Sequence, residues 1–397
     1  MNVRRRSAVA LAAIAVVGAA AVPAVAAGPS PALPQGLFGT ADPTYDGVWR
    51  QSLALLAQDT QDLTPAPSAV AWLTGQQCAD GAFAPYRADP AADCTAKTPV
   101  DTNNTAAAVQ ALAALGGHGD AVDSAVTWLK SVQNKDGGWG YSPGGASDAN
   151  STSVVIGALT ATGGDPAEVV KNGRSPYDAL LTFALPCAKD GGAFAFQPDQ
   201  DGKLTANADA TAAGVLGALG KGLTAEAGQA AGAAECAAAD SPAQAAANGA
   251  AYLAGAVAKD GHLTSALAGS EDQPDYGNTA DAVLALAAQG GAERAAKPLA
   301  WLERHAGDWA KQSGPAGYAQ LILAARAAGA DPADFGGTDL VTALNATGPS
   351  PEKQDTEADE KPAAESDSPF GTWWYVGVFA VVGVGIGFLI SNRKRQP

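Results

Sequence analysis

The sequence predicts an all-α fold in which about six helical hairpins form an inner and an outer ring of helices. Three observations lead to this fold class. Segments with one polar face alternate with segments that are apolar almost all round. Glycine pairs end the apolar segments, and no strand-like run bounded by turns interrupts the pattern. Such hairpins stack as an open solenoid or close into a ring, and the degenerate terminal copies favour closure.

The outer helices are the amphipathic segments. In AVDSAVTWLKSVQ, residues 121–133, apolar residues recur at positions i, i+3, i+4 and i+7, and polar residues take the opposite side. A helix with one wet face belongs on the outside of the ring. The aromatic anchors of these helices are Trp72, Trp128, Phe183, Tyr252 and Trp301.

The inner helices begin at four related stretches, DTNNTA, DANSTS, NADATA and DYGNTA. Their first residue is always a short polar side chain, which is typical of a helix N-cap. In a closed ring these starts gather at one mouth, where polar groups beside an apolar cavity describe a ligand site. The same polar residues can cap their helices and also bind a ligand. The predicted ligand-binding residues are Asp101, Asn103, Asn104, Asp148, Asn150, Trp139, Tyr141, Asp275 and Asn278.

Both chain ends carry signals for export and anchoring. Residues 1–26 have the arginines, apolar run and small-residue ending of a signal peptide. The helical domain is expected over residues 38–346, followed by an acidic, Pro-rich disordered linker at 347–369. Residues 371–390 are uncharged and long enough to span a membrane, and the basic tail at 391–397 should remain cytoplasmic. We therefore expect secretion through the signal peptide, a membrane anchor and an extracellular ectodomain.

Charge and cysteine content narrow the functional classes. The chain has 40 acidic and 24 basic residues, so we expect no nucleic acid partner. Four cysteines in an exported chain indicate two disulfides, and we expect Cys78 with Cys94 and Cys187 with Cys236, although spacing alone permits three pairings. A zinc site is the competing interpretation. We expect no metal, because the sequence has no CxxC motif and only three scattered histidines.

One motif carries a resemblance to a known family. An aromatic-aliphatic pair, a glutamine, a glycine and a second aromatic recur at Trp72, Leu73, Gln77, Gly81 and Phe83, and again at Trp128, Leu129, Gln133, Gly137 and Trp139. The motif resembles the QW repeat of squalene and oxidosqualene cyclases. The wider pattern, over Asp42–Ala346, resembles the alpha/alpha toroid superfamily of prenyltransferases and terpenoid cyclases. We expect the glutamines to bond backbone groups and the tryptophans to pack between repeats, both structural roles.

The resemblance also implies a place to look for catalysis. Class II terpene cyclases use a D-x-D-D-T-A motif whose middle aspartate protonates the substrate. In DTNNTA, Asn103 and Asn104 stand where the motif has its two key aspartates. An amide side chain cannot donate a proton at a useful pKa. NADATA retains Asp209 at the middle position but has no second acid beside it. Residue sets for a prenyltransferase zinc or a polysaccharide lyase are incomplete, so Asp209 is the only catalytic candidate and the sequence leans away from an enzyme.

A toroid without a full catalytic set is similar to the toroid domain of the cobalamin carriers intrinsic factor and transcobalamin. The sequence therefore predicts a membrane-tethered, non-catalytic toroid that captures a small ligand, with a corrinoid as one candidate, or a protein partner. It would feed a membrane transporter or share its ligand with a separate lid protein, and it would need no cofactor. Two alternatives stay open: a terpenoid cyclase or prenyltransferase-type enzyme that depends on Asp209, and a structural or adhesive surface module.

Overall fold

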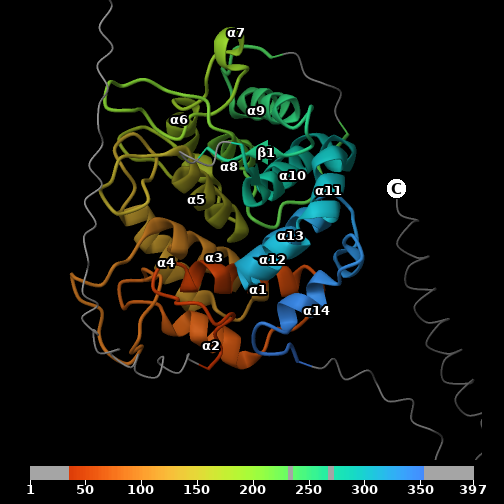
Figure 1. Ribbon diagram of the computed structural model, residues 1–397. Helices are drawn as coiled ribbons and strands as arrows, with labels where there is room; N and C mark the ends of the chain where they lie inside the picture. The colour runs from red at the N-terminus through yellow and green to blue at the C-terminus, as the bar shows by residue number, and fades with distance from the viewer. Residues whose placement is uncertain (1–34, 231–235, 267–271, 353–397) are drawn as a thin grey trace, which may run out of the picture. The chain divides into compact units, whose positions relative to one another are not determined.

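Six helices form an inner ring. They are α1 (Gly47–Asp59), α3 (Thr102–Leu115), α5 (Ala149–Ala161), α8 (Ala208–Ala218), α10 (Tyr276–Gly290) and α13 (Pro315–Ala327). In the computed structural model, which describes residues 35–230, 236–266 and 272–352, each of these helices packs on the next and α13 returns to α1. Figure 1 shows these six helices arranged as a ring. The predicted all-α toroid is therefore confirmed, in its closed form.

The remaining helices surround the ring or connect its members. They are α2 (Pro67–Gly75), α4 (Gly119–Ser131), α6 (Pro176–Leu181), α7 (Cys187–Asp190), α9 (Pro242–Ala256), α11 (Ala292–His305), α12 (Gly307–Ser313) and α14 (Leu340–Asn345), with 3-10 turns at η1 (Pro166–Glu168) and η2 (Pro332–Asp334). One feature was not predicted: β1 (Leu263–Thr264) pairs antiparallel with β2 (Pro274–Asp275). This ladder is only two residues long and leads directly into α10, so it arises from the turn before an inner helix.

Backbone hydrogen bonds join neighbouring repeats at the starts of the inner helices. The N–H groups of Val48, Thr102 and Ala149 donate to the carbonyl oxygens of Pro85, Tyr141 and Phe196, each over 2.9 Å. Each acceptor lies in the loop that precedes the next inner helix. The ends of the domain meet in the same manner, because Gly39 N–H donates to Thr347 O over 2.8 Å and Gln58 Nε2 donates to Asn345 Oδ1 over 2.7 Å.

The two QW-like motifs have the structural roles that the sequence predicts. Gln77 Nε2 donates to Gly81 O over 3.1 Å and to Ala121 O over 2.8 Å. Gln133 Nε2 makes the equivalent bonds to Gly137 O over 2.8 Å and Val169 O over 3.0 Å. Each glutamine thus fastens its own turn to the following repeat.

The motif glycines cannot be replaced without strain. Gly81 and Gly137 have φ angles of 98° and 90°, which side-chain-bearing residues rarely adopt. A Cβ atom on Gly137 would lie 2.3 Å from the carbonyl oxygen of Ser175, and one on Gly81 would lie 2.2 Å from that of Ser124. The backbone of the next repeat therefore occupies the space that a side chain would need.

Both expected disulfides are present. Cys78 pairs with Cys94, and Cys187 pairs with Cys236, with Cα atoms 5.6 Å apart in each bond. The first closes a loop before α3, and the second joins the start of α7 to the segment that precedes α9. Disulfide bonding of all four cysteines is confirmed.

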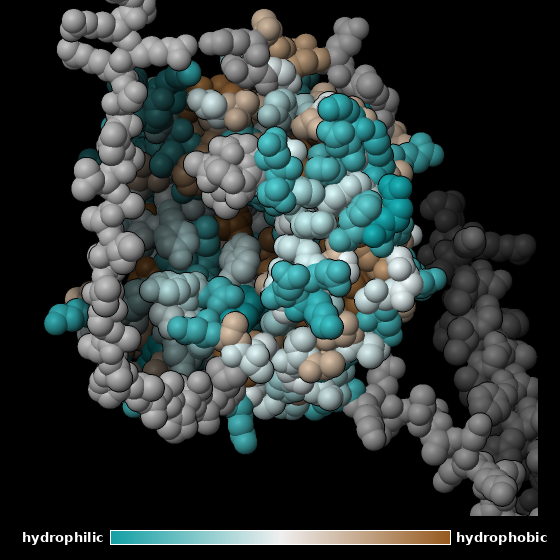
Figure 2. Space-filling view, viewed as in Figure 1, coloured by the Kyte–Doolittle hydropathy of each residue, from teal (hydrophilic) through white to brown (hydrophobic). Residues whose placement is uncertain are grey.

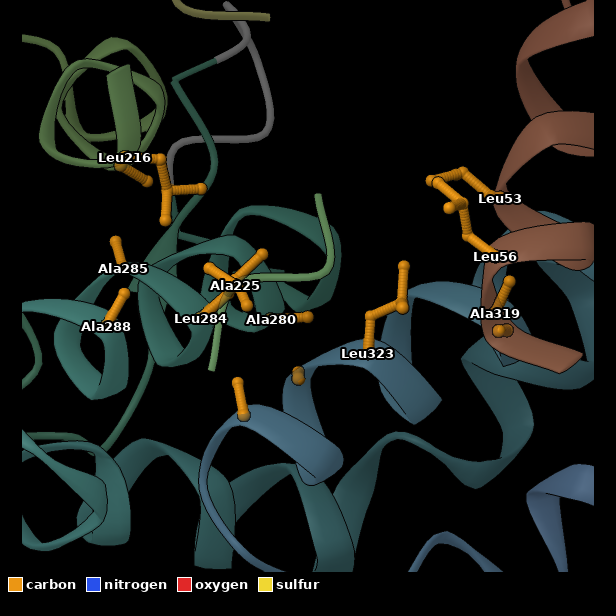
Figure 3. Packing of buried hydrophobic residues seen from close by; sticks show 14 of the residues in the cluster. Leu53, Leu56, Leu216, Ala225, Ala280, Leu284, Ala285, Ala288, Ala319 and Leu323 are labelled. Carbon is orange, nitrogen blue, oxygen red and sulfur yellow. The ribbon is translucent and has the colours of Figure 1, made fainter. Parts of the chain in front are cut away.

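The core lies between the helices and around the lumen of the ring. Figure 3 shows that it combines leucines with small alanines from facing helices, including Leu53 and Leu56 of α1, Leu216 of α8, Leu284 of α10 and Leu323 of α13. The alanines, such as Ala280, Ala285 and Ala319, let the inner helices approach closely. Leucines such as Leu216 and Leu284 also line the lumen of the ring.

The signal peptide (1–26), most of the linker, the predicted span (371–390) and the tail (391–397) lie outside the described residues. Within the described ranges, no helix combines the length and apolar character needed to cross a bilayer. The membrane anchor and the export signal thus stay predictions.

Candidate functional site

The polar first residues of the inner helices cap those helices. Asp101 accepts a hydrogen bond from Asn104 N over 2.7 Å, and Asp148 accepts one from Ser151 N over 2.7 Å. The Asn207 and Asp275 side chains accept from the N–H groups of the third residue of their own helices in the same way. Burial raises the pKa of both Asp101 and Asp148, although these hydrogen bonds oppose the rise.

The lumen of the ring contains a cavity of about 210 Å³. Its polar lining includes Asn103 of α3, Asn150 of α5, Asp209 of α8 and Asp281 of α10; Trp49, Leu216, Leu223 and Leu284 supply apolar surface. A second cavity of about 160 Å³ adjoins it through Trp49, Leu223, Asp281 and Leu284. Figure 2 shows apolar surface recessed near the centre of the ring, behind a more polar rim. An apolar chamber with a few convergent polar groups is typical of a ligand site.

Asp209 enters this chamber from the first turn of α8. Asn150 Nδ2, on the neighbouring helix α5, donates to Asp209 Oδ2 over 2.8 Å. Burial raises the pKa of the Asp209 carboxyl, and the negative charge of Asp275 raises it further, while the Asn150 bond opposes both. Asp209 therefore holds its proton at a higher pH than an exposed aspartate.

Asp281 supplies a second carboxyl to the same chamber. Gln320 Nε2, on α13, donates to Asp281 Oδ1 over 2.7 Å and to Gly277 O over 3.1 Å. Burial raises the pKa of Asp281 to about 7; the Gln320 bond opposes this shift, and the charges of Asp209 and Asp275 add to it. Asp281 keeps some accessible surface because it lines the lumen. At neutral pH it is protonated in a substantial fraction of molecules.

Asp281 was not among the predicted site residues, because it lies outside the inner-helix starts that carry the repeated motif. Asp281 lies one turn further along α10, and ring closure brings it into the chamber that Asp209 enters. A signal was present: Asp281 is a lone acid inside the otherwise apolar run TADAVLALAAQG. Gln110 and Gln320 are the same kind of exception on α3 and α13, and both make interhelical hydrogen bonds.

The structure places the predicted ligand-binding residues in three environments. Asn103 and Asn150 line the lumen. Asn104 and Asn278 donate through Nδ2 to Asp101 and Asp275 over 2.8 Å, so these four residues form capping pairs. Asp148 caps α5.

The two predicted aromatic residues lie apart from the lumen lining. Trp139 is 1% exposed and donates its indole N–H to Leu129 O over 2.7 Å, whereas Tyr141 is half exposed. A ligand-binding role for all of these residues stays a prediction. In the described part of the chain, no three His, Cys, Asp or Glu side chains gather as metal ligands. The absence of a metal likewise stays an expectation.

Comparison with known proteins identifies the domain. Residues 44–224 match the model of the prenyltransferase alpha-alpha toroid domain. Drimenyl diphosphate synthase from Streptantibioticus cattleyicolor is 42% identical over 78 residues, which are 20% of this chain and 13% of that protein.

Two solved structures are similar to this chain at lower levels. ent-Copalyl diphosphate synthase from Streptomyces platensis is 17% identical, with a TM-score of 0.48 over 71% of this chain and 50% of that one. A protein from Actinoplanes is also 17% identical, with a TM-score of 0.33 over 70% and 99% of the two chains.

These comparisons correct the function that we expected. A non-catalytic toroid that captures a corrinoid or a protein partner is contradicted, because the matching relative is a terpene synthase. They favour the alternative, a terpenoid cyclase-type enzyme. The expectation rested on the lack of a second acid beside Asp209 in the sequence, whereas the structure places Asp281, from another repeat, in the same cavity.

Proposed function

Because this chain belongs to the toroid superfamily of prenyltransferases and terpenoid cyclases, we propose that it is a terpenoid cyclase-type enzyme that starts ring closure by protonating a carbon–carbon double bond. One observation carries the proposal. Asp209 and Asp281 line the same apolar chamber, and burial raises the pKa of both carboxyls, that of Asp281 to about 7. A carboxyl that stays protonated near neutral pH is what such a reaction requires.

Asp209 is the proposed proton donor, since it holds the middle position of NADATA. Its O–H bond breaks, the proton forms a C–H bond with the π electrons of the substrate, and a positive charge remains on the neighbouring carbon. The π electrons of the next double bond then close a ring. Loss of a proton from a carbon beside the final cation restores a double bond. The product is an isomer of the substrate, and no co-reactant is consumed.

Asp281 is the proposed tuning partner of Asp209. Two carboxyls in one chamber titrate as a pair, because ionisation of one opposes ionisation of the other. Asn150 holds Asp209 and Gln320 holds Asp281, so each acid is fixed in place by an amide from a neighbouring helix. This arrangement keeps a proton in the chamber without a second acid in the NADATA motif itself.

The apolar surface of the chamber has two proposed roles. Leu216, Leu223 and Leu284 bury the isoprenoid chain, since they remove its hydrocarbon surface from water. Trp49 offers an aromatic side chain to the same space, and an aromatic face attracts a positive charge. Both features favour a reaction that passes through carbocations.

Turnover of isoprenoid substrates tests the proposal. We would incubate the full chain with squalene, farnesol, farnesyl diphosphate and geranylgeranyl diphosphate, and identify products by gas chromatography and mass spectrometry. Asp209→Asn should abolish cyclised product, whereas Asp123→Asn, on the exposed face of α4, should leave it unchanged. Cyclised product that persists in Asp209→Asn at the wild-type rate would contradict the assignment of the acid.

We also propose that the enzyme works outside the cytoplasm on a membrane tether. The support is the signal-peptide pattern of residues 1–26 and the apolar segment 371–390. Two disulfides in the domain favour an oxidising compartment as well. Protease treatment of intact cells tests this: the domain should be digested, and protection in unbroken cells would contradict it.

A further inference from the structure

At four of the six inner helices, the N-cap side chain already accepts a hydrogen bond from a backbone N–H of the first turn. The start of a helix normally binds phosphate through exposed N–H groups and its positive dipole end. Here Asp101, Asp148 and Asp275 already accept hydrogen bonds from those N–H groups at three inner helices, and Asn207 does so at a fourth. A carboxylate cap takes one of these donors and, when ionised, also repels an anion.

The opposite end of the lumen is equally unsuited to phosphate. Inner helices α3, α5, α8 and α10 present their carbonyl ends there, which is the negative end of each dipole. Residues 221–228 cross this end. Leu223 N–H donates to Gln110 Oε1 of α3 over 2.8 Å, and Gly228 N–H donates to Ala287 O of α10 over 2.9 Å. This crossing segment joins two helices of the ring and supplies Leu223 to both cavities.

The side-chain charges of the lumen also disfavour an anion. Among the described residues that line the two cavities, Lys221 is the single cation, and its side chain is exposed to solvent. Asp209 and Asp281 are the lining acids, and Asp275 lies close enough for its charge to act on both. A multiply charged diphosphate would meet aspartate-capped helix starts at one end and helix carbonyls at the other, and among the described lining residues only Lys221 could offset its charge.

We propose that the lumen selects a neutral isoprenoid, a hydrocarbon or an alcohol, and discriminates against the diphosphate ester of the same chain. The inference rests on the proposed function, because it names the substrate class of the same chamber. It sets this chain apart from the relatives, whose names describe diphosphates. A neutral chain can enter the apolar chamber without desolvating an anion beside carboxyl groups.

Binding of a matched pair of ligands tests the inference. Farnesol and farnesyl diphosphate share one hydrocarbon chain and differ in the charged group. Calorimetric titration of the full chain, with and without Mg²⁺, needs no turnover, so its outcome is independent of whether the proposed reaction occurs. We expect farnesol to bind at least about tenfold more tightly than farnesyl diphosphate. At pH 8, above the pKa of about 7 of Asp281, Asp281→Asn should narrow this ratio of affinities, because it removes one negative charge from the lining.

A Lys221→Gln variant tests the strongest rival. If the exposed lysine holds a diphosphate at the end of the lumen that residues 221–228 cross, the wild type will bind farnesyl diphosphate as tightly as farnesol or more tightly, and Lys221→Gln will weaken that binding. Equal or tighter binding of farnesyl diphosphate by the wild type would overturn the inference, and so would weaker binding of farnesyl diphosphate by Lys221→Gln. If the inference is right, Lys221→Gln will leave the ratio of the two affinities unchanged, and so will Lys130→Gln on the exposed face of α4.

Discussion

Replacing Asp281 with asparagine is expected to flatten the pH dependence of folding stability. The pKa of Asp281 rises from 3.8 to about 7 on folding. The unfolded chain therefore loses this proton at a lower pH than the folded chain, and wild-type stability falls as the pH rises from about 4 to about 7. At 1.36 kcal/mol for each pKa unit, the loss is about 4 kcal/mol at most. Water in the lumen will reduce it.

The asparagine variant keeps the shape of the side chain and an acceptor for Gln320 but cannot ionise. Urea unfolding of both proteins at pH 4.5, 6 and 8, with disulfides intact, measures the difference. The variant should gain stability relative to the wild type at each step upward in pH, and the gain should level off above about pH 7. If the free energy of unfolding changed with pH in the same way for both proteins, the raised pKa of Asp281 would be refuted.

Three further predictions follow from the same structure. Cyclase activity should fall as the pH rises past the raised pKa of Asp209, and Asp275→Asn should move this fall to lower pH, because the charge of Asp275 no longer helps to hold a proton on Asp209; a profile that does not move would contradict this coupling. Gly137→Ala should cost at least about 2 kcal/mol of stability, whereas Gly144→Ala, also at positive φ but in open space, should cost about 1, as thermal unfolding can measure. Replacing Cys187 and Cys236 with serine should lower stability by about 4 kcal/mol, given their separation of 49 residues, and an unchanged melting temperature would contradict this.

Much of the fold could be predicted from particular residues. The glutamine and glycine of each QW-like motif have fixed partners in the turn and in the next repeat, so their spacing carries the geometry. The polar caps could be predicted as well, since capping is local and needs only three residues of sequence. The disulfide pairing could also be predicted, because each bond joins cysteines that lie in the loops between the predicted helices.

The candidate site could be predicted only in part, because it depends on ring closure. Asp209, Asn103 and Asn150 share one register position in three repeats, and self-alignment finds them. Asp281 belongs to a different register, one turn deeper, and its proximity to Asp209 depends on how α8 and α10 pack. Its pKa depends on burial, which sequence spacing does not report. The predicted capture function was inferred from an incomplete set of catalytic residues, and the family and relative that the chain matches overturn it.

Reaction in deuterium oxide tests the central claim most directly. If a lumen aspartic acid starts the cyclisation, the proton that it donates comes from solvent and remains in the product as a carbon-bound hydrogen. Mass spectrometry of the cyclised product should then show the incorporation of one deuterium per molecule, with no product from Asp209→Asn. Cyclised product without deuterium would mean that the reaction starts in another way and would contradict the account.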